Sequence, residues 1–184
     1  MAVGPLHSTL RRHPAADTLV EESGHLVVGK PALVSPIVAR GYAVWSAACE
    51  EGALPLADDL KAEALAGILP YVYLVDVLSK AGPGPEEIVD FRYRLVGTDV
   101  VSHTEADNTG RRLSEIAGQG SQGTLIRLYA LASDAAVPAV QRIAFRTRSG
   151  SRHWYETIVM PMAMERGGPV ARLLGVAEHF CQRA

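Results

Sequence analysis

The chain has 184 residues, 48% hydrophobic and 21% charged, with a formal net charge of -2. This composition is typical of one globular domain with a proper core. The small charge excludes strong attraction to nucleic acid or anionic membranes, and no apolar run approaches the roughly 20 residues of a transmembrane helix. The composition of the first residues predicts no secretory signal, and Cys49 and Cys181 lie in no metal or redox spacing. We expect a cytoplasmic protein with free thiols.

The first third of the sequence divides into two predicted segments. Residues 1–33 mix Pro, Gly, His and charge without a sustained period, which predicts a flexible N-terminal arm. Residues 34–69 form a predicted N-terminal helical segment. Within it, Val34 to Glu50 repeats apolar residues at three- and four-residue steps, which indicates an amphipathic helix. A second short helix should follow and end at Pro70.

From Tyr71 onward the period of the apolar residues drops to two, which predicts strands. Two strands, Tyr71–Lys80 and Ile88–Gly97, flank a turn rich in Gly and Pro. A helix is predicted over Gln122–Ala135, and three more strands follow Pro138. This order argues for an α+β fold with a five-stranded antiparallel sheet over residues 70–184. Phe91, Tyr93 and Leu95 should share one face of the second strand, opposite Arg92 and Arg94.

Two short motifs carry a resemblance to a known family. Arg94-Leu95-Val96-Gly97-Thr98 ends the second strand, and Thr109-Gly110-Arg111 precedes a short helical turn. In this order and spacing they resemble the "R-L-x-G-T" strand end and "T-G-R" helix entry of a bacterial, largely alphaproteobacterial PAS-like family. In that family a helix precedes the PAS core. The resemblance covers about Val34 to His179, and its motif residues are Arg94, Gly97, Thr98, Thr109, Gly110 and Arg111.

The resemblance implies a stand-alone, non-enzymatic sensory or interaction module. It implies an unidentified small molecule between the sheet and the helical waist, a signalling protein on another chain as partner, and a homodimer. No nucleic-acid or membrane partner is implied. The cofactor is unknown. Flavin photochemistry is disfavoured, because it needs a reactive cysteine in the waist and neither Cys49 nor Cys181 lies there. The candidate residues of the ligand pocket are Tyr93, Leu95, Leu125, Leu128, Phe145, Trp154 and Ile158.

Two groups of titratable side chains have the residue types of a metal site and of an anion site. His103, Glu105 and Asp107 step by two and point apart on a helix, so no metal site is predicted. Arginines also alternate along two strands, and carboxylates on strands are expected to pair with them rather than with an anionic partner. These arginines are Arg92, Arg94, Arg142, Arg146 and Arg148, and the carboxylates are Asp76, Glu156 and Glu178.

Two alternative functions remain open at this stage. In the first, the chain is a ligand-free scaffold that dimerises through its N-terminal helix, with Tyr42 and Trp45 as interface anchors. In the second, it is a small cone-shaped enzyme of the isomerase kind, in which a tyrosine and a buried carboxylate move protons. The residues of the required types are Tyr73, Tyr93, Asp76 and Glu156.

Overall fold

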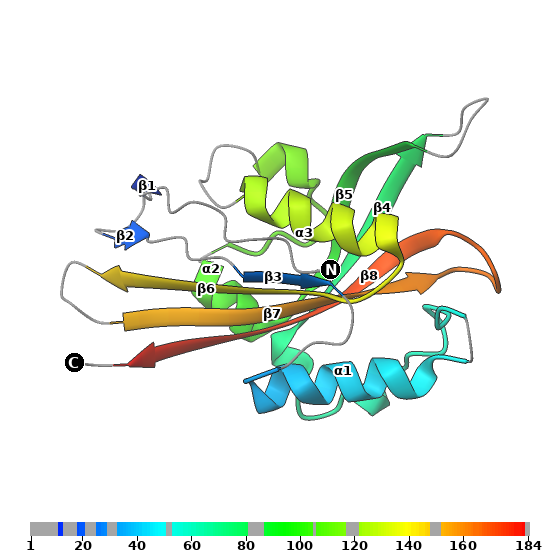
Figure 1. The fold of residues 1–184 in the computed structure, drawn as a ribbon, viewed down its shortest axis with the longest axis horizontal. Coiled ribbons are helices and arrows are strands. Elements are labelled where there is room, and N and C mark those ends of the chain that lie inside the picture. Colours follow the sequence, from blue (N-terminus) through cyan, green and yellow to red (C-terminus); the bar gives the residue numbers. More distant parts are fainter. Residues whose placement is uncertain are drawn as a thin grey trace.

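An antiparallel sheet lies between helices in the computed structural model of the chain (Figure 1). Helix α1 (Pro36–Ala48) covers one face, here called the α1 face. Helices α2 (Thr98–Thr104) and α3 (Gln122–Ala135) lie on the other, the α3 face. The structure describes residues 11–12, 18–20, 25–28, 33–50, 53–80, 87–104, 106–116, 122–147 and 152–182. None of the described helices combines the length and the apolar character that a membrane span needs.

The five predicted strands form the body of the sheet, which confirms the α+β class. In spatial order they are β6 (Ala139–Thr147), β7 (Arg152–Ala163), β8 (Val170–Gln182), β4 (Val72–Lys80) and β5 (Glu87–Val96). Neighbours pair antiparallel throughout. Strands β5 and β6 lie at opposite edges of these five strands, and α2 and α3 come between them in the chain, so the helices cross the α3 face.

Three short strands from residues 1–33 extend the sheet to eight strands. They are β1 (Arg11–Arg12), β2 (Thr18–Val20) and β3 (His25–Val28). β2 pairs with one end of β6 and β3 with the other, while β1 pairs with β2. The prediction of five strands therefore holds for the PAS-like core and undercounts the whole sheet. The predicted flexibility of residues 1–33 stays a prediction.

Helix α1 starts where its sequence supplies a cap. The Ser35 hydroxyl accepts a hydrogen bond from the Val38 N–H at 2.9 Å, and Pro36 begins the helix, where a missing N–H costs nothing. Beyond α1, the described part of the segment forms the 3-10 turns η1 (Ala62–Leu65) and η2 (Leu69–Tyr71) in place of the predicted second α-helix.

Apolar side chains pack into one cluster on each face of the sheet. On the α1 face, α1 and η1 contribute to a cluster whose buried members are Val38, Trp45, Leu65, Ile68, Val72, Val140, Ile158, Met160, Met162, Leu174 and Val176. On the α3 face, the buried members are Tyr73, Val75, Phe91, Leu113, Leu128, Tyr129, Ala132, Ala139, Val159, Leu173 and Ala177. The sheet is thus covered on both sides, and α1 shares a core with the strands.

Trp45 is part of this core and not an interface anchor. Its side chain is 7% exposed, and its indole N–H donates to the Pro161 carbonyl at 2.9 Å. Tyr42 stacks on it with ring centroids 6.2 Å apart and is half-buried. The prediction that Trp45 anchors a partner is therefore wrong, because this side chain is buried between α1 and the sheet of its own chain.

Replacing Trp45 with phenylalanine should lower the free energy of unfolding by about 2 kcal/mol, since the Pro161 carbonyl loses its donor inside the core. Urea unfolding measures the loss, with Tyr42→Phe as the control for a neighbouring ring. Light scattering should give the same molecular mass for both variants and the wild type. If the Trp45→Phe variant has a different molecular mass but the same free energy of unfolding as the wild type, Trp45 lies at an interface between chains.

Candidate functional site

Four hydroxyl groups meet on the α3 face, and we call them the hydroxyl cluster: Tyr73, Tyr93, Tyr129 and Thr157. They come from β4, β5, α3 and β7. The hydroxyls of Tyr73 and Thr157 are 2.8 Å apart, and those of Tyr93 and Tyr129 are 2.9 Å apart. The three rings contact one another with centroids 6.3 Å apart. Elements distant in sequence therefore bring polar groups together inside an apolar cluster.

Burial further favours the neutral form of these tyrosines. Tyr73 is 4% and Tyr129 1% exposed, and desolvation raises the pKa of both phenols well above their usual range. The pKa of Tyr93 is also raised by burial. A neutral hydroxyl both donates and accepts. Convergent groups of this kind, in apolar surroundings, are suited to orient a small molecule by a few hydrogen bonds.

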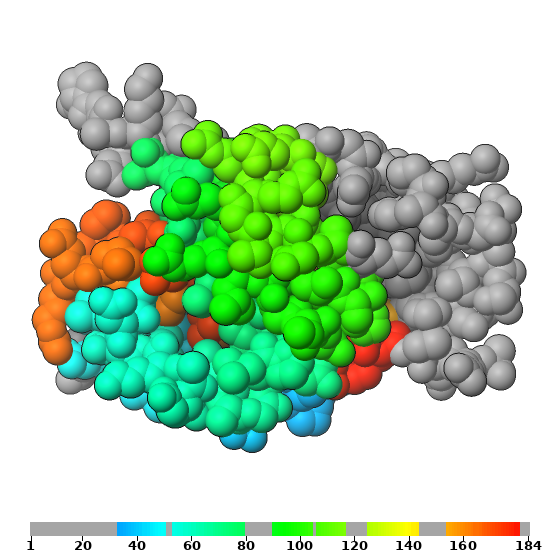
Figure 2. Space-filling model, turned by 180° about the vertical axis from the view of Figure 1, so that it is seen from behind, coloured from blue at the N-terminus to red at the C-terminus, as the bar shows by residue number. Residues whose placement is uncertain are grey.

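Helices cover this cluster from solvent. In the space-filling view, the segment running from α2 to α3, coloured green to yellow-green, lies over the middle of the sheet (Figure 2). Strand residues show beside this segment, among them the red of β8 and the orange of the β7–β8 turn. A ligand that reached the hydroxyl cluster would therefore have to pass or displace this cover.

The predicted pocket residues divide between the two faces. Tyr93, Leu125 and Leu128 lie together on the α3 face. Ile158 is buried on the α1 face, and Trp154 has the same strand parity and stacks on Phe180 with ring centroids 3.9 Å apart. The sheet therefore separates Ile158 and Trp154 from Tyr93, and the prediction of one pocket that contains all three is wrong. Alternate residues of β7 point to opposite faces, so Thr157 faces Tyr93 and Ile158 does not. The Phe145 side chain lies outside the described residues.

Leu95 leaves the predicted set because β5 carries a bulge. Leu95 is opposite Leu74, but Tyr93 is opposite Val75, so Arg94 is an extra residue in the ladder. Leu74 packs on the α1-face cluster and Val75 in the α3-face cluster. Leu95 therefore shares no face with Tyr93, and it is 43% exposed.

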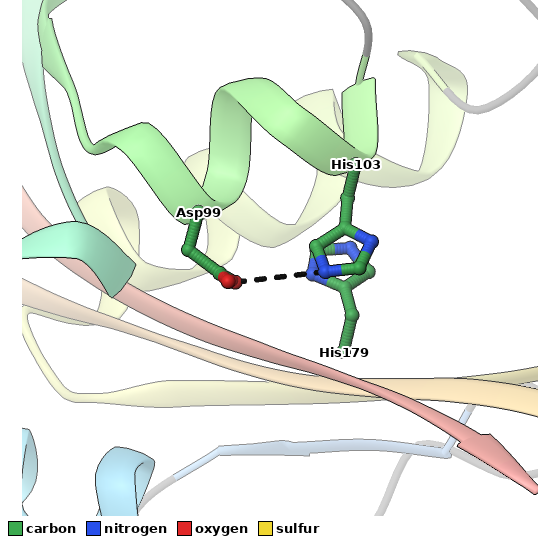
Figure 3. Close-up of side chains that lie close together, drawn as sticks. All are labelled: Asp99, His103 and His179. Atoms are coloured by element: carbon green, nitrogen blue, oxygen red, sulfur yellow. Dashed lines mark ion pairs between the residues drawn. The ribbon is translucent and has the colours of Figure 1, made fainter.

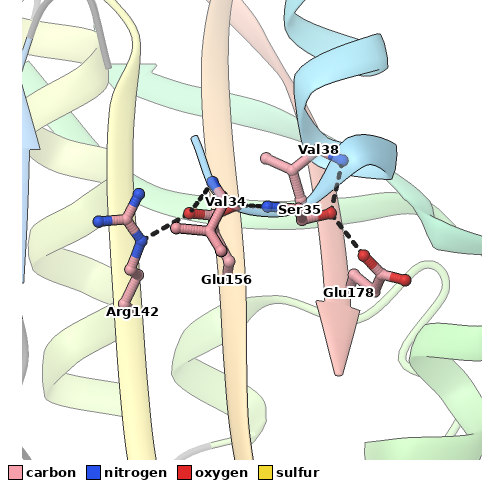
Figure 4. A network of polar contacts seen from close by, with 6 residues as sticks. All are labelled: Val34, Ser35, Val38, Arg142, Glu156 and Glu178. Carbon is pink, nitrogen blue, oxygen red and sulfur yellow. Dashed lines mark hydrogen bonds and ion pairs between the residues drawn. The ribbon is translucent and has the colours of Figure 1, made fainter. Parts of the chain in front are cut away.

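A buried carboxylate on the α1 face holds the start of α1 (Figure 4). Glu156 is 0% exposed and accepts hydrogen bonds from the Ser35 N–H at 2.7 Å and the Val34 N–H at 3.1 Å. Arg142 donates to it at 2.5 Å. The Ser35 hydroxyl in turn donates to Glu178 at 2.5 Å. We call this group the α1 anchor, since it ties the helix start to β6, β7 and β8.

The arginines of the sheet are paired as predicted where their side chains are described. Asp76 contacts Arg92 at 3.2 Å, Arg94 at 3.5 Å and Arg172 at 3.0 Å. Arg142 pairs with Glu156. Glu178 instead accepts from Ser35, and the side chains of Arg146 and Arg148 lie outside the described residues.

The residues of the isomerase alternative are not brought together. Tyr73 and Tyr93 lie on the α3 face, whereas Asp76 and Glu156 bind arginines on the α1 face. The sheet separates each tyrosine of this set from each carboxylate. These four residues therefore form no proton-transfer pair.

A second group of titratable side chains lies where α2 packs on β8 (Figure 3). Asp99 and His103 project from α2 toward His179 on β8. The Asp99 Oδ2 and His103 Nε2 atoms are 3.7 Å apart. The imidazole rings of His103 and His179 stack with centroids 4.2 Å apart. Sequence reasoning missed this group because it joined His103 to Glu105 and Asp107. Asp107 is exposed and accepts the Thr109 N–H, and Glu105 lies outside the described residues.

Acid should destabilise the protein through His179. Burial, and then neighbouring His103, lower the pKa of His179 to about 4, against about 6.5 in an unfolded chain. The unfolded state therefore binds the proton more readily, so this contribution is complete above about pH 6.5 and is lost as pH falls toward 4. Asp99 and Tyr155 are the other titratable groups facing the ring.

The measurement is urea unfolding at pH 7.5 and pH 5 in the presence of a chelator. Between these values the wild type should lose about 2 kcal/mol more than His179→Phe, which keeps a ring but cannot be protonated. Equal losses in the two proteins would show that His179 is not the group responsible.

The family-motif residues at the end of β5 and in the turn at Gly110 lie next to the hydroxyl cluster in the chain or contact the backbone of Tyr93. The Gly110 N–H donates to the Tyr93 carbonyl at 2.7 Å, and the Tyr93 N–H donates to the Arg111 carbonyl at 3.0 Å. Gly110 has a positive φ of 82°, which favours glycine. Thr98 begins α2 directly after Gly97, and Arg94 reaches Asp76. Gly110 and Arg111 thus position the backbone of Tyr93, and none of these motif residues is a member of the hydroxyl cluster.

Residues 35–178 match the family model described as the PAS domain. The chain belongs to the PAS domain family. The matched range includes α1 as well as the sheet, so it crosses the predicted boundary at residue 70, and the domain boundaries stay predictions. A search of curated proteins found no match.

The solved structure of an RNA-binding light-oxygen-voltage receptor is similar to this PAS domain chain. The sequences are 17% identical and the TM-score is 0.39. The match covers 86% of this chain and 39% of the other, so the chain spans well under half of that receptor's length.

Proposed function

We propose that this PAS domain is a non-enzymatic sensory and interaction module of bacterial signalling. A small molecule binds on the α3 face at the hydroxyl cluster, and α1 passes the signal to a signalling protein on another chain. The module acts in the cytoplasm as a homodimer, through a surface other than Trp45. The observation that carries the proposal is that Thr157 of the hydroxyl cluster and Glu156 of the α1 anchor are consecutive residues of β7.

Strand β7 connects the two sites through consecutive residues. Thr157 points to the α3 face and shares a hydrogen bond with Tyr73. Glu156, the residue before it, points to the α1 face and holds the Val34 and Ser35 N–H groups. A ligand that changes the Tyr73–Thr157 contact would displace the backbone that presents Glu156. Binding on one face would then change how firmly α1 is held on the other, which is a coupling between two sites.

Hydrogen exchange of the α1 amides tests this connection. Thr157→Val removes the hydroxyl next to Glu156 and should speed exchange over Pro36–Ala48, because the anchor is loosened. Tyr93→Phe is the matched control, since it removes a hydroxyl of the same cluster but no atom of β7. If both variants exchange like the wild type over α1, the two faces are not coupled.

We propose no nucleic-acid role. The RNA-binding receptor above is too dissimilar to argue for one, and the arginines of the α1 face whose side chains are described contact carboxylates. The ligand-free dimeric scaffold remains the competing function. It differs from the sensor in one observable, the presence of a bound small molecule.

A further inference from the structure

Three side chains with metal-binding atoms converge between α2 and β8. Asp99, His103 and His179 each offer one ligand atom, and these atoms all lie within 4.8 Å of one another. In Figure 3 the carboxylate of Asp99 and the ring of His103 both point toward the ring of His179. This group shares no residue with the hydroxyl cluster or with the α1 anchor.

The positions of these three residues on α2 and β8 bring their side chains together. Asp99 and His103 are four residues apart on α2 and therefore lie on the same helix face. His179 has the same strand parity as Ala177, a member of the α3-face cluster, and so points toward the helix. Two elements that pack against each other thus supply a carboxylate and two imidazoles to one point.

Within the described residues the hydrogen bonding of this group is incomplete. The Asp99 Oδ2 and His179 Nδ1 atoms are inaccessible to solvent and have no hydrogen-bond partner. The 3.7 Å between Asp99 and His103 is too long for a hydrogen bond. Buried polar atoms without a partner are rare and call for an explanation, an ion among them.

We propose that Asp99, His103 and His179 bind one divalent transition-metal ion, with Zn²⁺ or Co²⁺ as suitable probes. Two imidazole nitrogens and one carboxylate oxygen favour such ions over Mg²⁺ and Ca²⁺, which prefer oxygen ligands alone. Ligand atoms of a tetrahedral zinc site lie about 3.4 Å apart, given bonds of about 2.0–2.1 Å. The side chain of His103 is 43% exposed, so it can turn to close this gap.

The ion would link α2 to β8 and so fasten part of the cover over the α3 face. It would leave coordination positions for water or for an added ligand on the exposed side, where His103 lies. This proposal stands independently of the proposed function, because it uses neither the hydroxyl cluster nor the α1 anchor.

The test uses the full chain without an affinity tag, stripped with a chelator. Titration with Co²⁺ should give one equivalent of bound ion and visible absorption bands of nitrogen and oxygen ligation. Titration with Zn²⁺ should raise the Tm by about 5–10 °C at a hundredfold excess over Kd. The His103→Ala variant should bind the ion about 10–100-fold more weakly or worse. Even groups that only support the metal ligands contribute this much to metal affinity.

Asp107→Asn is the matched control, because Asp107 is an exposed carboxylate close to α2 but outside the group. It should bind Co²⁺ like the wild type. The proposal is overturned if the wild type binds no ion, or if His103→Ala binds it as tightly as the wild type. Should His103→Ala fail to fold, the wild-type stoichiometry and the spectrum of bound Co²⁺ decide alone: an unchanged spectrum of aqueous Co²⁺ rejects the site.

Discussion

Replacing Glu156 with alanine should lower the free energy of unfolding by about 3 kcal/mol. The carboxylate is fully buried, and its removal takes the acceptor from the Val34 and Ser35 N–H groups and breaks the ion pair with Arg142. Breaking a buried ion pair typically costs about 3–5 kcal/mol. We expect the lower end of this range, because the Arg142 side chain is 32% exposed and part of its charge remains hydrated.

Urea unfolding of three variants measures this effect. Glu156→Gln keeps the volume and one acceptor oxygen, so it should lose less than Glu156→Ala. Glu63→Ala removes an exposed glutamate and should change stability by less than about 0.5 kcal/mol. Hydrogen exchange should show that the loss begins at α1. A Glu156→Ala protein as stable as the wild type would contradict the α1 anchor.

Replacing Gly97 with alanine should destabilise the protein by about 3 kcal/mol. A Cβ at this position would lie 2.6 Å from the Leu69 carbonyl oxygen and still closer to that of Pro70. Both are backbone atoms, which cannot turn aside as a side chain can. The Gly97 N–H also donates to the Val72 carbonyl at 2.8 Å, so moving the loop would break this bond.

Gly110→Ala is the control for this prediction. It has a positive φ, yet a Cβ there meets nothing within 4 Å, so only backbone strain of about 1–2 kcal/mol is expected. Thermal or urea unfolding of both variants separates close packing from conformational strain. If Gly110→Ala is the more damaged of the two, the close approach at Gly97 does not explain that glycine.

Local patterns in the sequence predicted the elements well because they depend on near neighbours. The helix expected over Gln122–Ala135 is α3, and the apolar steps from Val34 to Glu50 enclose α1. The strand expected over Tyr71–Lys80 begins one residue later, at Val72. Where a second short helix was predicted, the chain forms the 3-10 turns η1 and η2. A short apolar pattern does not distinguish such turns from a short α-helix.

The faces of the strands were harder to predict than the strands. A parity argument places Leu95 beside Tyr93, and the extra residue Arg94 defeats it without any signal in the residue types. Ile158 and Tyr93 are on different strands, so their relative faces depend on the register across the sheet. Only the folded chain shows that Thr157, and not Ile158, meets the tyrosines.

The Asp99–His103–His179 group illustrates a partly readable site. The four-residue spacing of Asp99 and His103 within a helical turn was available in the sequence. His179 could not be assigned to them, because it comes from the last strand and meets α2 only after the sheet has formed. The same holds for Glu156, whose partners Val34 and Ser35 lie 122 and 121 residues away.

Native mass spectrometry of the untagged protein, purified from its own host and treated with a chelator, tests the central claim most directly. The account predicts a non-covalent organic mass on the native protein that is missing from the denatured spectrum. A smaller fraction of the Tyr129→Phe variant should carry this mass, because the variant lacks one hydroxyl of the cluster. Identical native and denatured chain masses would contradict a small-molecule sensor, and a ligand-free mass of twice the chain would favour the dimeric scaffold.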